Sequence, residues 1–163
     1  FMITGVFYRQ GNYETPPNQR LTTPCGDENK AIAAVFQLSE NAPFGIDPIP
    51  VGAISTRGLV QGICFTDDKK MVLSTSYALA SSNLYFYDLE KACEKTGTTE
   101  WLGTQVPLIW LDETSLVKTV KAPPMAEEIA FRNGRILILT ESASNLYLFG
   151  KFTGAGTLYS YAE

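Results

Sequence analysis

The side chains that could hold a metal ion lie at the start of two similar segments. Gln61 opens one segment, and Glu127 with Glu128 opens the other. Carboxylate and amide oxygens are the ligands that Ca²⁺ and Mg²⁺ prefer in proteins. Gln61 and Glu127 are therefore candidate ligands for one of these ions. The alternative, also open, is that both glutamates are loop residues satisfied by backbone amides or water.

A carboxylate that could exchange protons follows the second segment. Glu141 ends an apolar stretch and is matched by Thr75 in the first segment. A buried carboxylate has a raised pKa and can act as a general acid or base, but pairing with arginine or a hydrogen bond to Ser142 is the structural alternative. Ser76 and Ser142 occupy matching positions, and both are expected to stabilise turns through their hydroxyls.

Several familiar catalytic arrangements are excluded by composition. The chain has no histidine, which removes Ser-His-Asp triads, Cys-His pairs and histidine-based zinc sites. The cysteines Cys25, Cys64 and Cys93 have no Cys-x-x-Cys spacing and cannot all pair, although one bridge between Cys25 and Cys93 stays open. No glycine-rich phosphate loop is present, because the glycines of 150–154 are wrongly spaced and predict a hairpin turn.

Tyrosines offer another kind of binding surface, since the phenol ring is large and rigid and carries one hydroxyl. Tyr77, which follows Ser76, is also one of the channel-facing candidates. Packing between sheets is the alternative role for the group, which comprises Tyr77, Tyr85, Tyr87, Tyr147, Tyr159 and Tyr161.

Length and charge limit the class of protein. The 163 residues suit one domain or part of a larger one, and 45% hydrophobic against 18% charged residues excludes intrinsic disorder. The 13 basic and 17 acidic residues form no long run, so no nucleic-acid partner is expected. No apolar run is long enough for a membrane span. The chain begins with Phe1, so we expect any targeting peptide to have been removed or to lie outside this fragment.

The elements that must position these residues repeat along the chain. Aligning Ile63 with Ile129 gives an offset of 129 − 63 = 66, and the quartet Ser-Asn-Leu-Tyr recurs at 82–85 and 144–147. Each copy predicts three short strands, with turns at 67–69 and at Asn133-Gly134. A fourth strand is expected at 106–111 in the first copy, after a short helix at 88–95, and at 156–161 in the second.

Antiparallel sheets repeated at this interval predict an all-β, β-propeller-like fold of about two full four-stranded blades plus part of a third. The strands at 84–87 and 146–149 are apolar on both faces, so both faces must be covered. Residues 58–122 and 123–163 are the expected full blades. Residues 1–57 form a partial or degenerate blade with strands at 2–8 and 31–36 joined by a long polar loop. An amphipathic helix over 30–38 is the alternative for the second of these.

The number of blades implies a partner. Propellers close with about four to eight blades, and this chain supplies about two and a half. We therefore expect either a second polypeptide that supplies the missing blades or a homo-oligomeric ring.

Two groups of residues resemble a known family. Residues 60–63 with 74–77, and residues 124–127 with Glu141 and Ser142, are similar to the C-terminal half of a poorly characterised family of secreted bacterial β-propeller proteins. The resemblance implies a propeller fold, an earlier half outside this chain and a secreted or cell-envelope location.

These observations favour a binding or scaffolding module of an exported bacterial protein. The ligand would meet channel-facing candidates, namely Gln61, Ser76, Tyr77, Glu127, Glu128, Glu141 and Ser142. The alternative is a metal-dependent, lactonase-like hydrolase with Ca²⁺ or Mg²⁺ in the channel. A third reading is recognition of glycans or peptides through the tyrosines. Whether the protein is an enzyme stays open at this point.

Overall fold

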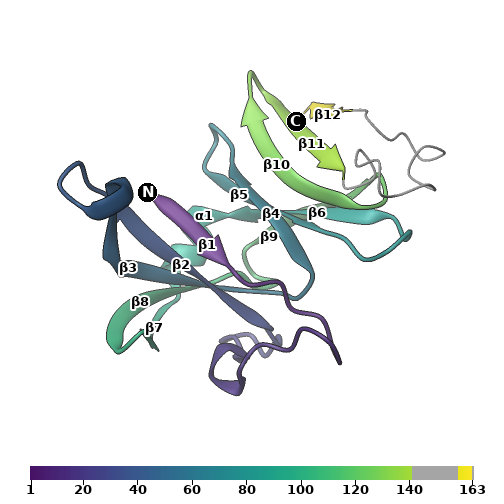
Figure 1. Cartoon of the computed structure of the whole chain (residues 1–163). Coiled ribbons are helices and arrows are strands. Elements are labelled where there is room, and N and C mark those ends of the chain that lie inside the picture. Colours follow the sequence, from purple (N-terminus) through teal and green to yellow (C-terminus); the bar gives the residue numbers. More distant parts are fainter. Residues whose placement is uncertain (141–157, 163) are drawn as a thin grey trace. The chain divides into compact units, whose positions relative to one another are not determined.

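The computed structural model describes residues 1–140 and 158–162. These residues confirm the all-β prediction, with 57% strand and 8% helix arranged in three sheets (Figure 1). The chain divides into two compact units. Unit 1 contains residues 1–58 and 90–115, and unit 2 contains residues 59–89 and 116–163.

Unit 1 is built on one five-stranded sheet. The strands of this sheet pair antiparallel except β3 and β8, which are parallel. A long loop follows β1 and contains the 3-10 turn η1 (Pro17–Gln19). In spatial order the strands are β1 (Met2–Gly5), β2 (Ala31–Leu38), β3 (Ile46–Thr56), β8 (Thr104–Trp110) and β7 (Thr96–Trp101).

The strand at β2 excludes the helix that the sequence left open for this segment. Four consecutive residues, 31–34, are all at most 2% exposed, so both faces of the strand are covered. A surface helix would instead bury one stripe. β1 pairs directly with β2, from Met2 opposite Phe36 to Gly5 opposite Ala33.

Unit 2 contains two sheets. The first sheet has the order β4 (Val60–Phe65), β5 (Lys70–Thr75), β6 (Ser82–Asp88) and β9 (Leu116–Ala122). The second has the order β10 (Ala126–Arg132), β11 (Arg135–Thr140) and β12 (Tyr159–Ala162). The predicted turn between β10 and β11 is confirmed, because Asn133 and Gly134 both have positive φ, 52° and 70°, as a type I′ turn requires. The short predicted helix is also present, as α1 (Leu89–Glu94).

The expected fourth strand of the first sheet is wrong. The stretch predicted at 106–111 forms β8, which pairs with β3 and β7, while β9 takes the fourth place beside β6. Buried Val106 and Leu108 pack against Ile32 and Ala53 of unit 1, whereas β9 alternates in burial as an edge strand does. Residues 90–115, expected within the blade 58–122, therefore belong to unit 1. The predicted strand at 146–149 lies outside the described residues.

An apolar core joins the two sheets of unit 2. Both sheets contribute aliphatic side chains to it, and Phe86 is fully buried. Phe86 and Tyr87 are adjacent and 0% and 1% exposed, so both faces of β6 are buried, as its sequence predicts. The buried core residues are Cys64, Val72, Leu84, Phe86, Ala122, Ala126, Ile129, Ile136 and Ile138.

Candidate functional site

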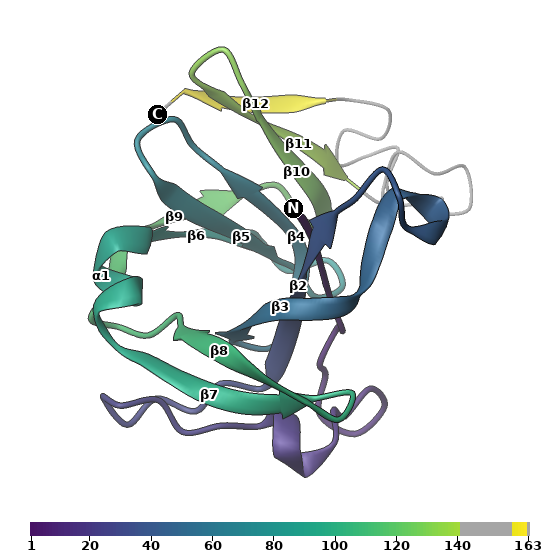
Figure 2. The ribbon, with the colours of Figure 1, turned by 90° about the vertical axis from the view of Figure 1, so that its left-hand side faces the viewer.

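Two candidate residues from the sequence meet where β4 and β10 begin. The amide nitrogen Nε2 of Gln61 donates to Oε1 of Glu127 at 3.2 Å. The hydroxyl of Ser74 on β5 donates to the backbone oxygen of Glu127 at 2.6 Å. These contacts tie the two sheets of unit 2 together at one end, and Figure 2 shows β10 beside β4 there.

A glycine permits this close approach. A Cβ atom at Gly62 would lie 2.6 Å from the backbone oxygen of Glu127 and 2.9 Å from the nitrogen of Ile129. Real Cβ atoms do not tolerate such distances to backbone atoms. The sequence therefore places a glycine where two strand edges touch, and the side chains of Gln61 and Glu127 are brought together as a result.

The other candidates lie near this end with different roles. Ser76 is buried, and its backbone nitrogen donates to the oxygen of Leu59, just before β4, at 3.2 Å. Tyr77 is 47% exposed. Glu128 is exposed, and its carboxylate accepts a hydrogen bond from the nitrogen of Ile129 at 3.2 Å. Glu141 and Ser142 lie outside the described residues.

The side chains at this end suit polar recognition better than a divalent cation. Ca²⁺ takes about six to eight oxygen ligands. Gln61 directs its N–H, not its oxygen, at Glu127. Within residues 1–140 and 158–162, no group of three or more acidic, cysteine or histidine side chains could hold a metal ion. The arrangement offers one carboxylate and one amide as hydrogen-bonding groups.

Most of the candidate tyrosines that the structure describes pack within unit 2. Tyr87 is 1% exposed, and Tyr159 and Tyr161 pack against the core of unit 2. Lys118 on β9 lies over the rings of Phe86 and Tyr161, with its Nζ 4.4 Å and 5.5 Å from their centroids. Among the candidate tyrosines in the described part of the chain, Tyr77 is the exposed one, at 47%.

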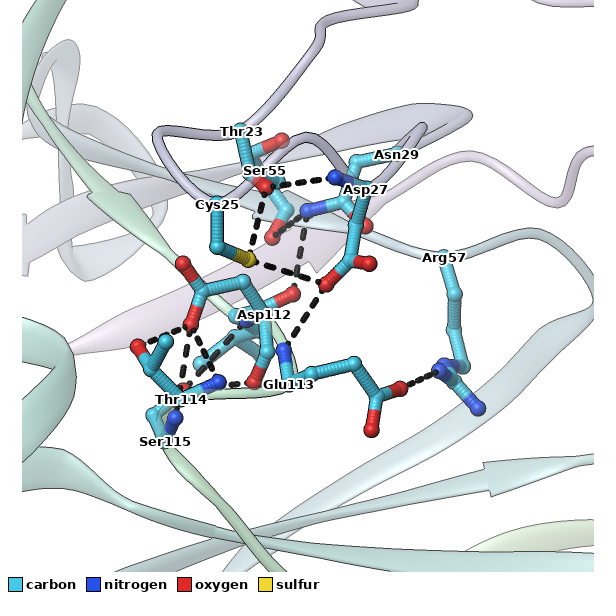
Figure 3. A network of polar contacts seen from close by, with 11 residues as sticks. Thr23, Cys25, Asp27, Asn29, Ser55, Arg57, Asp112, Glu113, Thr114 and Ser115 are labelled. Atoms are coloured by element: carbon cyan, nitrogen blue, oxygen red, sulfur yellow. Dashed lines mark hydrogen bonds and ion pairs between the residues drawn. The ribbon is translucent and has the colours of Figure 1, made fainter.

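A second polar site, which the sequence analysis did not predict, lies in unit 1 (Figure 3). The backbone nitrogen of Asp27 donates to Oγ1 of Thr23 at 3.1 Å, and the Cys25 thiol donates to Oδ2 of Asp27 at 3.2 Å. The same Oδ2 accepts from the backbone nitrogen of Glu113 at 2.8 Å. A tight turn in the long loop is thereby fastened to the segment after β8, 86 residues away.

Asp112 is the buried charge of this network, with 4% of its surface exposed. Its Oδ1 accepts from the backbone nitrogen and hydroxyl of Thr114, at 3.0 Å and 2.6 Å, and from the nitrogen of Ser115 at 3.3 Å. Its Oδ2 is buried and receives no hydrogen bond of normal geometry. Burial by itself raises the pKa of Asp112, but the hydrogen-bonding groups of Thr114, the nearby Cys25 thiol and the Ser115 backbone outweigh it and lower the pKa below its usual value.

Asn29 connects three parts of unit 1. It is 4% exposed, and its Nδ2 donates to the backbone oxygens of Ser55 at 3.0 Å and Leu111 at 3.1 Å. Ser55 lies near the end of β3, and Leu111 directly follows β8, the strand that pairs parallel to β3. Asn29 therefore adds a second donor to the Ser55 oxygen, which also accepts from the backbone nitrogen of Leu111 at 3.2 Å, and supplies a donor to the Leu111 oxygen.

The network is structural in character, and the sequence signals for it are local. The order Asp112-Glu113-Thr114-Ser115 is typical of turns in which aspartate, threonine and serine side chains bond nearby backbone. Its link to Asp27 depends on folding and could not be predicted. None of the three cysteines is in a disulfide, so the bridge between Cys25 and Cys93 is not formed.

A hollow of about 350 Å³ lies beside the long loop of unit 1. Its two cations are already paired, Arg20 with Glu14 at 3.1 Å and Lys30 with Glu28. Both cations of the hollow are therefore partly neutralised by neighbouring carboxylates. Its lining residues are Pro17, Arg20, Leu21, Thr22, Glu28, Asn29 and Lys30.

Two findings complete the description of the sites. No described helix has the length and apolar character needed to cross a membrane. Comparison of the chain with protein-family models, with curated proteins and with solved structures gave no match.

Proposed function

We propose that this chain is a β-propeller segment that serves as a binding or scaffolding module of an exported bacterial protein. Its ligand would meet the end of unit 2 where Gln61 and Glu127 lie. The observation that carries the proposal is the matched pair of hairpins, β4–β5 and β10–β11, whose first strands approach within backbone contact at Gly62.

Two backbone details support treating the two hairpins as copies of one blade. Leu59 and Met125 both have left-handed backbone, with φ of 64° and 61°, immediately before β4 and β10. Such a conformation is costly for large residues and is rarely repeated by chance. Each hairpin also has a register shift near its start, between Val60 and Gly62 and between Ala126 and Ile129.

The ladders also give a consistent alignment. Val60 pairs with Thr75, and Ala126 pairs with Thr140, so the offset is 126 − 60 = 66 before the turn and 140 − 75 = 65 after it. The second hairpin is one residue shorter because its turn is the two-residue Asn133-Gly134 type. Repeated sheets stacked face to face through an apolar core are the building principle of propellers.

The polar end of unit 2 supports a role in binding. In a propeller, first strands line the central channel, so polar groups at their starts face a common axis. Gln61 and Glu127 supply an amide and a carboxylate, and Tyr77 supplies an exposed ring at the end of β5. A ligand with hydroxyl or amide groups and an apolar face, such as a glycan or a peptide, matches this set.

The experiment is a glycan and peptide array probed with the wild-type protein and three variants. Glu127→Ala and Gln61→Ala should each reduce retention of any bound ligand by about tenfold, the usual cost of losing a central polar contact. Glu94→Ala, which removes an exposed acid from α1, should leave retention unchanged. No retention by the wild-type protein, or retention that all variants share, would contradict the proposal.

Calorimetric titration with Ca²⁺ separates the metal-dependent alternative from this one. The binding module predicts no heat. Heat that disappears in Glu127→Ala would replace the proposed binding role by a metal site.

A further inference from the structure

We propose that a second copy of this chain docks head to tail on the first, with the β2–β3 arm of one copy against the outer face of the β10–β12 sheet of the next. The proposal names the partner that the proposed function leaves open, and it relies on that function for the stacking of sheets. The arm and the face are defined below.

The arm is the part of the β2–β3 hairpin that extends beyond the five-stranded sheet. β1 pairs only with residues 33–36 of β2, and β8 pairs only with residues 53–55 of β3. Among the described strands, residues 37–51 therefore pair only within the β2–β3 hairpin itself, and the dark blue hairpin carrying η2 (Pro43–Gly45) projects from the sheet in Figure 1. We call these residues the arm.

The arm carries more apolar surface than its own fold can use. Phe44 at its tip is 100% exposed, and Leu38, Ile49 and Val51 are 56%, 58% and 43% exposed. Phe44 also has left-handed backbone, with φ 62° and ψ 13°. A bulky residue pays about 1 kcal/mol for this conformation, which glycine adopts freely. Within residues 1–140 and 158–162 no side chain covers the Phe44 ring, and this exposed, strained aromatic residue points to contact with another molecule.

The outer face of the β10–β12 sheet is the side turned away from the core of unit 2. Ile136 and Ile138 of β11 point into that core, so the alternating residues Leu137 and Leu139 point outward. Leu139 is 49% exposed, and Leu158, just before β12, is 57% exposed. We define the outer face by the residues Ala130, Arg132, Arg135, Leu137, Leu139, Leu158, Ser160 and Ala162.

The equivalent side of the first sheet of unit 2 packs against another sheet. By the ladder alignment, Leu137 corresponds to Val72 of β5 (137 − 72 = 65). Val72 is 0% exposed because the β10–β12 sheet covers it. The same side of the preceding sheet is therefore an interface between sheets. Among the described strands of unit 2, none covers the outer face of the β10–β12 sheet.

Charge complementarity selects the arm of a second copy as that cover. Residues 31–56 contain two acids, Glu40 and Asp47, and no lysine or arginine. The outer face contains Arg132 and Arg135 directly opposite each other, which is an unfavourable pair within one sheet. Neither arginine forms an ion pair with a carboxylate of the described residues. An acidic arm would relieve this repulsion while covering the exposed leucines.

The resulting contact is heterologous, because the two surfaces are made of different residues. Heterologous contacts generate closed rings when the rotation permits and open filaments when it does not. Either outcome supplies further sheets to a chain whose own sheets are too few for a propeller.

The experiment compares oligomeric state by sedimentation velocity and light scattering. The wild-type protein should associate as its concentration rises. Phe44→Gly removes the aromatic ring and suits the left-handed backbone, and Leu139→Lys adds a charge to the outer face. Each variant alone should weaken association by about tenfold or more. An equimolar mixture of the two should recover one contact, since each variant keeps the surface that the other lacks.

Leu102→Gly is the matched control for the arm variant. Leu102 is also a large residue in a hairpin turn, with φ 50° and 79% exposure, but it lies between β7 and β8. Association should be unchanged in this control.

A wild-type protein that stays monomeric up to about 1 mM, or a mixture that remains dissociated, would overturn the proposal. Equal loss in Leu102→Gly would do so too. The proposal would also be overturned if the protein associated with a different polypeptide but not with a second copy of itself. A monomer that still retains its ligand on the array would leave the proposed function standing, so the two failures are distinguishable.

Discussion

Different interactions stabilise the interior of each of the two units. Unit 2 relies on apolar packing between two sheets, with Val72, Phe86 and Ile136 all 0% exposed. Unit 1 has a smaller apolar cluster around Ile32 and Leu108, and polar bonds fasten its loops to the ends of its strands. The difference indicates that unit 2 should be sensitive to lost volume, and that unit 1 should be sensitive to lost hydrogen-bond donors.

The largest expected effect is on the core of unit 2. Phe86 is 0% exposed and lies against Tyr161, with ring centroids 6.0 Å apart. Phe86→Ala should lower the free energy of unfolding by about 4 kcal/mol, because it removes a large buried ring and leaves a cavity. Denaturant unfolding followed by circular dichroism measures the change.

Tyr77→Ala is the control for Phe86→Ala, since this tyrosine is 47% exposed. It should cost no more than about 0.5 kcal/mol. A loss below about 1 kcal/mol for Phe86→Ala would show that unit 2 does not depend on this core as described.

The second largest effect concerns the seam between the sheets of unit 2. Gly62→Ala should cost about 2 kcal/mol, since the new methyl group meets backbone atoms that cannot move aside cheaply. Gly52→Ala in unit 1 is a matched control, because the nearest atoms to its Cβ are 3.7 Å and 3.8 Å away. Equal unfolding midpoints for the two variants would contradict the close approach of β4 to β10.

Much of unit 2 was predictable because its signals are local and repeated. Alternating apolar residues predicted the strands, and Asn133-Gly134 predicted the turn. The meeting of Gln61 with Glu127 followed from the alignment of the two copies. The sequence alignment used one offset, 66, on both sides of the turn. The ladders give an offset of 65 after the turn, because the Asn133-Gly134 turn is one residue shorter than the turn at 67–69.

Unit 1 was less predictable because its organisation depends on distant contacts. An apolar run such as 106–111 predicts a strand but does not name its neighbour, so β8 was assigned to the wrong sheet. The parallel pairing of β3 with β8 crosses more than fifty residues (108 − 53 = 55). The network of Asp27, Asn29 and Asp112 likewise joins segments that are far apart in the sequence. No short sequence motif predicts that these segments meet.

Asn29 tests the polar side of the comparison. Asn29→Ala should lower the free energy of unfolding by about 2 kcal/mol, because the buried oxygen of Leu111 loses its donor. Both tryptophans, Trp101 and Trp110, lie in unit 1, so their fluorescence is a suitable probe of unfolding there. Asn41→Ala, an exposed amide in the arm, is the control and should change stability little. Equal effects of the two substitutions would contradict the role assigned to Asn29.

The smallest effect should depend on pH. The folded state lowers the pKa of Asp112, so this carboxylate contributes stability above the ordinary aspartate pKa, about 4, and loses that contribution as pH falls through the lower folded-state pKa. Asp112→Asn should therefore cost about 1 kcal/mol near neutral pH, where the charged acceptor is lost. The difference from wild type should shrink in acid.

Unfolding curves of both proteins at a series of pH values measure this dependence. Asp67→Asn, in the exposed turn before β5, controls for the loss of one negative charge. A difference between wild type and Asp112→Asn that persists unchanged to about pH 2 would mean that the hydrogen bonds of Thr114 and Ser115 do not depend on the charge of Asp112. The polar network of unit 1 would then stabilise the fold without a contribution from the charge of Asp112. The two units would differ only in how many apolar side chains each one buries.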